Sequence, residues 1–122
     1  MVAYNFKDEF AGKVESGMKR QTIRAHRKRH ARPGERLQLY SRMRRKDCRK
    51  LVHPDPQCVS VEPIHISMVD GTLAVQVNGR DLDEDWRTDL ARADGFESDQ
   101  EMGLFFKSAH GLPFSGVLIR WE

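Results

Sequence analysis

A lysine, a threonine and an arginine lie close together in residues 17–24, which read GMKRQTIR. In an extended strand, side chains two residues apart share a face, so Thr22 and Arg24 are expected to point into one cleft. Gly17 permits a tight turn that would bring Lys19 to the same place. A lysine partly removed from water beside Arg24 would have a lowered pKa and could accept a proton from Thr22 or from water. The same side chains could instead only bind phosphate, so catalysis and binding both remain open.

Two basic segments follow this run and are the candidate nucleic-acid contacts. The first comprises Arg27, Lys28, Arg29 and Arg32, and the second includes Arg42, Arg44, Arg45 and Lys46. Arginine binds phosphate oxygens through its planar fork and stacks on bases, so two such segments beside one cleft would hold a nucleic-acid backbone. Tyr40 lies between them and is either a stacking platform for a base or a packed aromatic at a strand end.

Charge is distributed unevenly along the 122 residues, although the formal net charge is only +3. Residues 1–50 hold 16 lysines and arginines against 5 acidic residues, whereas residues 51–122 hold 5 against 13. A chain that separates its charge in this way presents a positive face to a polyanion such as RNA. The remaining interpretations are a solvated basic surface without a partner and a surface for an acidic protein.

The expected compartment is the cytoplasm, and no membrane partner is expected. No apolar run approaches the ~20 residues that cross a bilayer, and the first ten residues contain Lys7, Asp8 and Glu9 where a signal peptide would be apolar. Cys48, His53 and Cys58 are evenly spaced, but there is no C-x-x-C pair and no evident fourth ligand. We therefore expect neither a metal nor a cofactor.

The hydrophobic spacing predicts three helices and five strands. The helices are expected over residues 5–16, 81–94 and 98–110, and the strands over residues 21–24, 36–41, 59–69, 73–77 and 117–121. Trp86 and Trp121 lie on apolar faces and are expected in the core. This order predicts an α+β fold, with a small, mainly antiparallel β-barrel flanked by short helices, and a single domain over residues 1–122.

Three features in this order resemble the ASCH domain family of the PUA-like superfamily. They are the G-x-K-x-x-T-x-R run at residues 17–24, Pro33-Gly34 before a strand, and Ala93-Asp94-Gly95-Phe96 before the last helix and strand. The resemblance implies a PUA-like barrel with a cleft lined by the first run, and roles connected with RNA. Some bacterial members of the family are small amidohydrolases that deacetylate acetylcytidine nucleosides, and others are ribonucleases or binding modules.

The family's hydrolases use a lysine, a threonine and a glutamate near the late helix. By position these are Lys19, Thr22 and Asp94, with aspartate in the place of glutamate. Asp94 would orient the lysine or supply acid–base function. The expected function is binding of RNA or a nucleotide in a basic cleft. The alternatives are a hydrolase that uses these three residues, of amidohydrolase or ribonuclease type, and a phage-like regulatory protein that binds an acidic protein or a nucleic-acid complex.

Overall fold

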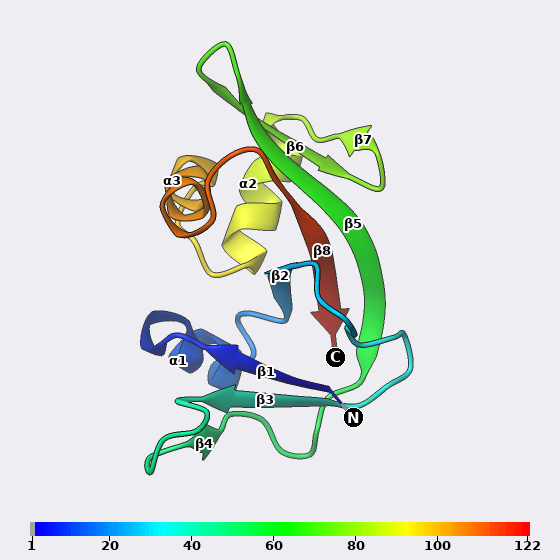
Figure 1. The fold of residues 1–122 in the computed structure, drawn as a ribbon, viewed down its shortest axis with the longest axis vertical. Coiled ribbons are helices and arrows are strands. Elements are labelled where there is room, and N and C mark those ends of the chain that lie inside the picture. Colours follow the sequence, from blue (N-terminus) through cyan, green and yellow to red (C-terminus); the bar gives the residue numbers. More distant parts are fainter. Residues whose placement is uncertain (1) are drawn as a thin grey trace.

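The computed structural model describes residues 2–122, which form two β-sheets and three helices (Figure 1). One sheet has the strand order β1-β3-β4, and the other has the order β2-β8-β5-β6-β7. The strands are β1 (Val2–Phe6), β2 (Gln21–Ala25), β3 (Leu37–Ser41), β4 (Arg49–Lys50), β5 (Cys58–Val69), β6 (Thr72–Val77), β7 (Arg80–Asp81) and β8 (Phe114–Trp121). The helices are α1 (Asp8–Ser16), α2 (Glu84–Ala93) and α3 (Asp99–Ala109).

The α+β class is as predicted, and the sheets are mostly antiparallel. Only β1 and β3 pair in parallel among the strands of residues 2–122. The two sheets do not close into a barrel within this part of the chain, because β2 and β7 end one sheet and β1 and β4 end the other. The prediction of a closed barrel is therefore not met.

The first strand was not predicted, because its residues also fit a helical pattern. Val2, Tyr4 and Phe6 are buried and Asn5 is exposed, which is the alternation of a strand with one buried face. The predicted helix at residue 5 in fact begins at Asp8, with Lys7 as its N-cap. Phe6 fits the pattern of a helix as well as that of a strand. Residues 2–6 form a strand because they pair in register with β3, whose alternate residues are buried.

Two hydrophobic clusters pack the molecule, and strand β8 contributes to both. The first surrounds the three-stranded sheet and α1 and includes Ile119 and Trp121, whereas the second lies under α2 and α3 and includes Phe114 and Leu118. Figure 1 shows the three-stranded sheet and α1 at one end of the long axis, with α2 and α3 toward the other end. Strand β8 therefore joins the part that carries the basic segments to the part that carries the acidic helix α2.

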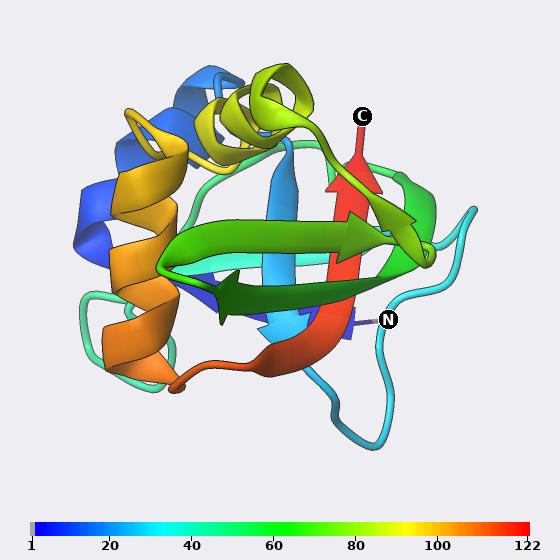
Figure 2. The same cartoon turned by 90° about the horizontal axis from the view of Figure 1, so that it is seen from above.

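The late helices pack against the five-stranded sheet, and α3 runs beside the β5–β6 hairpin (Figure 2). The side chain of Asp83 accepts a hydrogen bond from the backbone N–H of Trp86, and Ser98 accepts one from that of Glu101, so both helices have a polar N-cap. Trp121 is buried as predicted, but Trp86 is 66% exposed, so its assignment to the core was wrong. Within residues 2–122, no helix is long and apolar enough to cross a membrane.

Candidate functional site

A cleft of about 430 Å³ lies between the end of β1, helix α1, strand β2 and helix α3. Lys19, Thr22, Arg24 and Asp94 all line it, so the fold brings the four residues of the predicted site together. Thr22 and Arg24 come from alternate positions of β2, while Lys19 and Asp94 come from the segments that follow two helices.

Two helix ends place the charged pair of this cleft by the same backbone device. After α1, Gly17 adopts a left-handed conformation (φ 83°) and the N–H of Lys19 donates to the carbonyl of Lys13 at 2.9 Å. After α2, Gly95 is left-handed (φ 100°), and the N–H of Phe96 donates to the carbonyl of Ala91 at 2.9 Å. Glycine tolerates this conformation without steric cost, and such a reversal satisfies the last carbonyls of a helix. One reversal delivers Lys19 and the other delivers Asp94.

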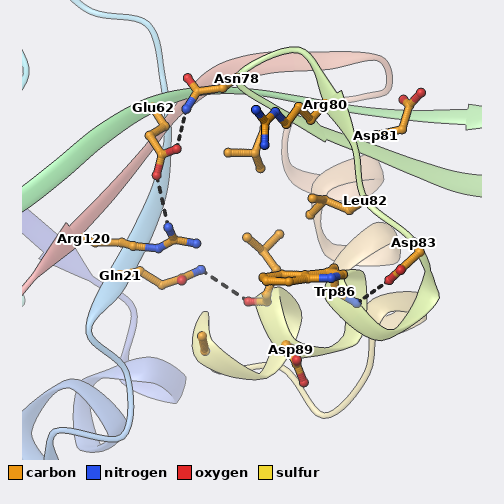
Figure 3. A pocket seen from close by; sticks show the side chains of 13 residues that line it. Gln21, Glu62, Asn78, Arg80, Asp81, Leu82, Asp83, Trp86, Asp89 and Arg120 are labelled. Atoms are coloured by element: carbon orange, nitrogen blue, oxygen red, sulfur yellow. Dashed lines mark hydrogen bonds and ion pairs between the residues drawn. The ribbon is translucent and has the colours of Figure 1, made fainter.

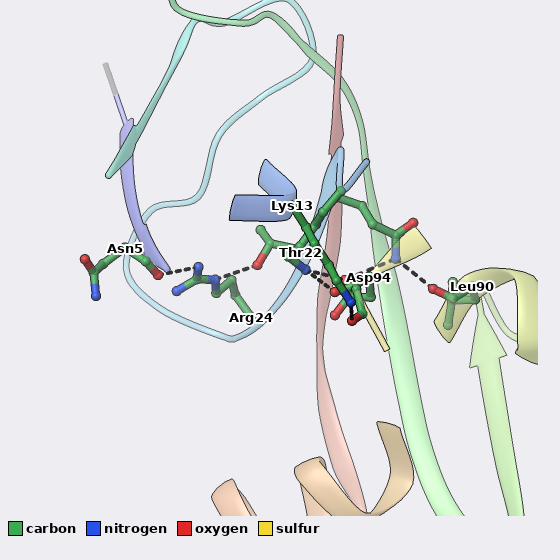
Figure 4. Close-up of polar contacts among 9 residues, drawn as sticks. Asn5, Lys13, Thr22, Arg24, Leu90 and Asp94 are labelled. Carbon is green, nitrogen blue, oxygen red and sulfur yellow. Dashed lines mark hydrogen bonds and ion pairs between the residues drawn. The ribbon is translucent and has the colours of Figure 1, made fainter. Parts of the chain in front are cut away.

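The ammonium of Lys19 is held by Asp94 in two ways. Its Nζ lies 2.6 Å from the backbone carbonyl oxygen of Asp94 and 3.2 Å from the carboxylate Oδ1. The two side chains are only 4% and 6% exposed. The side-chain amide of Gln21 also donates hydrogen bonds to Asp94 Oδ1, at 3.1 Å, and to the carbonyl of Leu90, at 3.3 Å. Figure 4 shows Asp94 and Leu90 with these polar contacts. The carboxylate is therefore fixed by two donors.

Burial shifts the pKa values of both charged partners toward their neutral forms. Desolvation lowers the pKa of Lys19, although the charge of Asp94 opposes this shift. Desolvation also raises the pKa of Asp94, although Lys19 and the hydrogen bond from Gln21 oppose it. A lysine with a lowered pKa exchanges a proton more easily near neutral pH than a solvated lysine does.

Thr22 and Arg24 form a second polar unit in the cleft (Figure 4). Arg24 Nε donates to Thr22 Oγ1 at 2.8 Å, and its Nη2 donates to the carbonyl of Asn5 at 2.7 Å. Within residues 2–122, no hydrogen bond joins Lys19 to Thr22, and the hydroxyl proton of Thr22 has no protein acceptor. The arrangement leaves that proton available to a ligand, while Arg24 would stabilise negative charge on the oxygen.

Aromatic rings form much of the cleft wall. Phe10, Phe96 and Phe105 make edge or tilted contacts with centroids 5.3–5.7 Å apart. Lys19 Nζ lies 5.2 Å from the centroid of Phe10, and the Arg24 guanidinium lies 5.0 Å from that of Phe6. A cation against a ring face is attracted by the ring, and at low solvation a charged cation also attracts an anion more strongly than it does in water.

The first basic segment is anchored on strand β1. Arg27 lies 4.6 Å above the ring of Tyr4, and Tyr4 Oη is 2.9 Å from His30 Nδ1. The other ring nitrogen of His30 is 2.9 Å from the carbonyl of Ala25, which can only accept, so His30 carries its proton on Nε2 and accepts from Tyr4. Burial lowers the pKa of His30, which favours this neutral form. The predicted contacts Arg27, Lys28, Arg29 and Arg32 are exposed and lie outside the cleft lining.

The second basic segment adjoins the other side of β1, and part of its charge is neutralised. Arg42 binds both Asp8, at 2.9 Å, and Asp47, while Met43 donates its N–H to the side chain of Asn5. In the same way Arg29 pairs with Glu35 in the first segment. The other three cations of the second segment, Arg44, Arg45 and Lys46, are exposed and have no carboxylate partner within residues 2–122.

Tyr40 is half-buried in β3 and is not part of the cleft lining. Cys48 is exposed and Cys58 is buried, and among residues 2–122 no group of three or more His, Cys, Asp or Glu side chains is placed to hold a metal ion.

Gln21 and the phenylalanine side chains of the cleft wall were not predicted from the sequence. Gln21 lies inside the motif, but its role depends on where α2 ends. Phe105 lies on the apolar face of the predicted helix at residues 98–110, and the same spacing is found in a core and in a cleft wall.

Comparison of the chain with protein-family models, with curated proteins and with solved structures gives no match in any of the three.

Proposed function

We propose that this chain binds RNA or a nucleotide in the cleft around Arg24, and that its fold is a variant of the PUA-like architecture related to the ASCH family. The observation that carries the proposal is the pairing of cleft cations with aromatic walls. Arg24 and Lys19 lie against phenylalanine rings in a cleft of about 430 Å³, which accepts a planar base with a phosphate beside it.

The surroundings of the cleft favour a polyanion. Both basic segments contact β1, whose last residues Asn5 and Phe6 line the cleft. The Arg27 guanidinium packs on the ring of Tyr4 in β1. The exposed cations of residues 44–46 belong to the second basic segment, which contacts β1 at Asn5. If an RNA strand were bound in the cleft, its phosphates on either side of the cleft would therefore lie near basic side chains.

The family relationship rests on the sequence motif and on what surrounds it. The motif threonine and arginine lie on β2, which pairs with the terminal strand β8, and the late helix α3 directly precedes that strand. The chain differs from a complete barrel because its two sheets are not hydrogen-bonded to each other within residues 2–122.

The direct test is the affinity of the protein for a short single-stranded RNA, measured by fluorescence anisotropy over a salt series. We expect the logarithm of the affinity to fall with that of the salt concentration by ~0.7 per phosphate contacted. Arg24→Gln should weaken binding about tenfold or more, because it removes charged hydrogen bonds inside the cleft. The matched control is Arg20→Gln, since Arg20 is exposed and the one hydrogen-bond partner of its side chain within residues 2–122 is the carbonyl of Gly17. Equal losses in the two variants would reject the cleft as the binding site.

A hydrolase is the second candidate, and one observation favours it. The hydroxyl of Thr22 accepts a hydrogen bond from Arg24 and keeps its own proton free. If a ligand displaced Lys19 from the carbonyl of Asp94, neutral Lys19 could accept that proton while the threonine oxygen added to the amide carbonyl carbon. The lysine ammonium would then give the proton to the departing amine as the C–N bond breaks, and water would hydrolyse the acetyl-threonine ester to acetate and free threonine.

This candidate is tested by acetate release from N4-acetylcytidine. Activity should be lost in Thr22→Ala and in Lys19→Ala, and should partly survive in Thr22→Ser, which keeps the hydroxyl. Chemical denaturation of each variant distinguishes lost chemistry from lost folding. Absence of acetate release by the folded wild-type protein would leave binding as the function of the cleft.

A further inference from the structure

A second cavity, of about 880 Å³, lies beside α2 and the β6–β7 hairpin (Figure 3). Strand β2 contributes to both cavities, because Gln21 lines this one and Thr22 lines the cleft. Residues 22–25 of the same strand line the cleft, and the linings of the two cavities have no residue in common. The proposed function of the cleft makes no use of this second cavity.

An exposed tryptophan is the main feature of the second cavity. Trp86 is 66% exposed, and the cavity around it is lined on the apolar side by Val77, Leu82 and Leu90. The backbone N–H of Trp86 is fixed by the side chain of Asp83 at 2.9 Å, so the residue sits in the first turn of a capped helix. An indole face that is open to solvent over an apolar floor is suited to stack a planar ring.

Polar groups of the sheet face this indole with their hydrogen-bonding capacity only partly used. The carboxylate of Glu62 accepts a hydrogen bond from Arg120 Nη1, at 3.1 Å, and another from the side-chain amide of Asn78. In Figure 3, Arg120 and Gln21 extend from the sheet toward Trp86. The bonds formed within residues 2–122 leave Arg120 Nη2 as a donor and the side-chain oxygens of Gln21 and Asn78 as acceptors. Mixed donors and acceptors beside a stacking surface match the edge of a nucleobase.

The charge around the second cavity selects against an anion. Four carboxylates line it, against two guanidinium groups, one of which already neutralises Glu62. The carboxylates are those of Glu62, Asp81, Asp83 and Asp89. Like charges repel a phosphate, whereas carboxylates readily accept hydrogen bonds from the hydroxyl groups of a sugar. This lining is the opposite of the cation-rich cleft.

We propose that the cavity beside Trp86 binds an uncharged nucleoside, with its base stacked on the indole and its edge read by Arg120, Gln21 and Asn78. The site excludes the corresponding nucleotide through its carboxylates. This inference does not depend on the proposed function of the cleft, because the two linings have no residue in common. Gln21 is connected to the cleft only by the hydrogen bond that its amide group donates to Asp94 within residues 2–122.

Intrinsic fluorescence tests this inference, because Trp121 is only 5% exposed and Trp86 is the accessible indole. Titration with adenosine, guanosine, cytidine and uridine should give a saturable change for at least one nucleoside, with Kd below about 1 mM. Its 5′-monophosphate should bind about tenfold more weakly. The change should disappear in Trp86→Phe. No saturable change up to about 10 mM with any of the four nucleosides, or an equal affinity for the monophosphate, would overturn the proposal.

Two variants locate the ligand and separate this site from the cleft. Asp89 lines the cavity, and its side chain forms no hydrogen bond within residues 2–122. Asp89→Asn should therefore narrow the difference in affinity between the nucleoside and its monophosphate. Asp85→Asn is the matched control, since Asp85 is exposed on the same helix but outside the lining. Arg24→Gln should leave the fluorescence response unchanged. A response lost in Arg24→Gln would assign the nucleoside to the cleft and reject the second site.

Discussion

The cleft and the surface of the second basic segment hold their cations in different ways. Lys19 is almost fully buried, with one buried carboxylate and two ring faces around it. Arg42 is exposed and is shared between two exposed carboxylates, those of Asp8 and Asp47. Both are lysine or arginine residues in the basic half of the chain, and a count of charges treats them alike.

Burial, rather than formal charge, decides how much a cation contributes to stability. A buried pair has lost its water, so removing one partner leaves a charge that nothing compensates. An exposed pair regains water when it is broken and contributes little to stability. The asymmetric charge of the sequence therefore does not identify the cations that define a site.

The largest expected effect is that of breaking the buried pair. Asp94→Ala should lower the free energy of unfolding by about 3–5 kcal/mol, because it leaves Lys19 desolvated without its carboxylate. Denaturation by urea or guanidinium measures this loss. The double variant Lys19→Met/Asp94→Leu should recover much of it, because apolar side chains replace both charges.

The control for this prediction is Asp8→Ala, which breaks an exposed pair with Arg42. Its effect on the free energy of unfolding should be far smaller than that of Asp94→Ala, because both partners of the exposed pair regain water when it is broken. If Asp94→Ala and Asp8→Ala cost the same, the distinction between the two kinds of cation is not valid.

Most of the elements could be predicted from the sequence, because their patterns are local. The strand alternation of residues 59–69, the helix cap at Ser98 and the glycine after each of the first two helices are visible without the fold. Strand β1 was missed because Phe6 serves both a strand and a helix pattern, and its parallel pairing with β3 is a long-range contact. The failure of the sheets to close is likewise a property of pairings between distant strands.

The site could be predicted only as a set of residues. The alternation of Thr22 and Arg24 on one strand placed them correctly in one cleft, and the family resemblance brought in Asp94. Proton transfer from Thr22 to Lys19 was one of the possibilities, but within residues 2–122 no hydrogen bond joins these side chains, because Lys19 is bound to Asp94 instead. Trp86 was misassigned because an apolar helix position does not reveal whether anything packs against it.

A smaller effect is expected at the glycine that presents Asp94. Gly95 has φ 100°, and a Cβ there would lie 3.0 Å from Phe10 and 3.3 Å from the Lys19 side chain. Gly95→Ala should therefore cost about 1–3 kcal/mol of unfolding free energy, and it should also weaken ligand binding by displacing Lys19. Gly12→Ala in α1 is the matched control, because a Cβ there meets nothing within 4 Å. That control should be neutral or stabilising by up to about 1 kcal/mol. A loss of stability at Gly12 equal to that at Gly95 would show that the left-handed reversal is not the cause.

The smallest effect is expected at the exposed pair, where a pKa is a more sensitive measure than stability. Hydrogen bonds from Arg42 hold the pKa of Asp8 below its ordinary value. Since the folded pKa is the lower one, this contribution to stability is present above the unfolded pKa of ~3.9 and is lost as the pH falls through the folded pKa.

In Arg42→Gln, the pKa of Asp8 should rise toward its ordinary value, as followed by NMR titration of the carboxyl carbon. Arg49→Gln is the matched control, because Arg49 pairs with Glu15 and should leave Asp8 unchanged. An Asp8 titration that is the same in Arg42→Gln as in the wild type would mean that the exposed pair does not persist in solution, and Arg42 would then be free to bind phosphate.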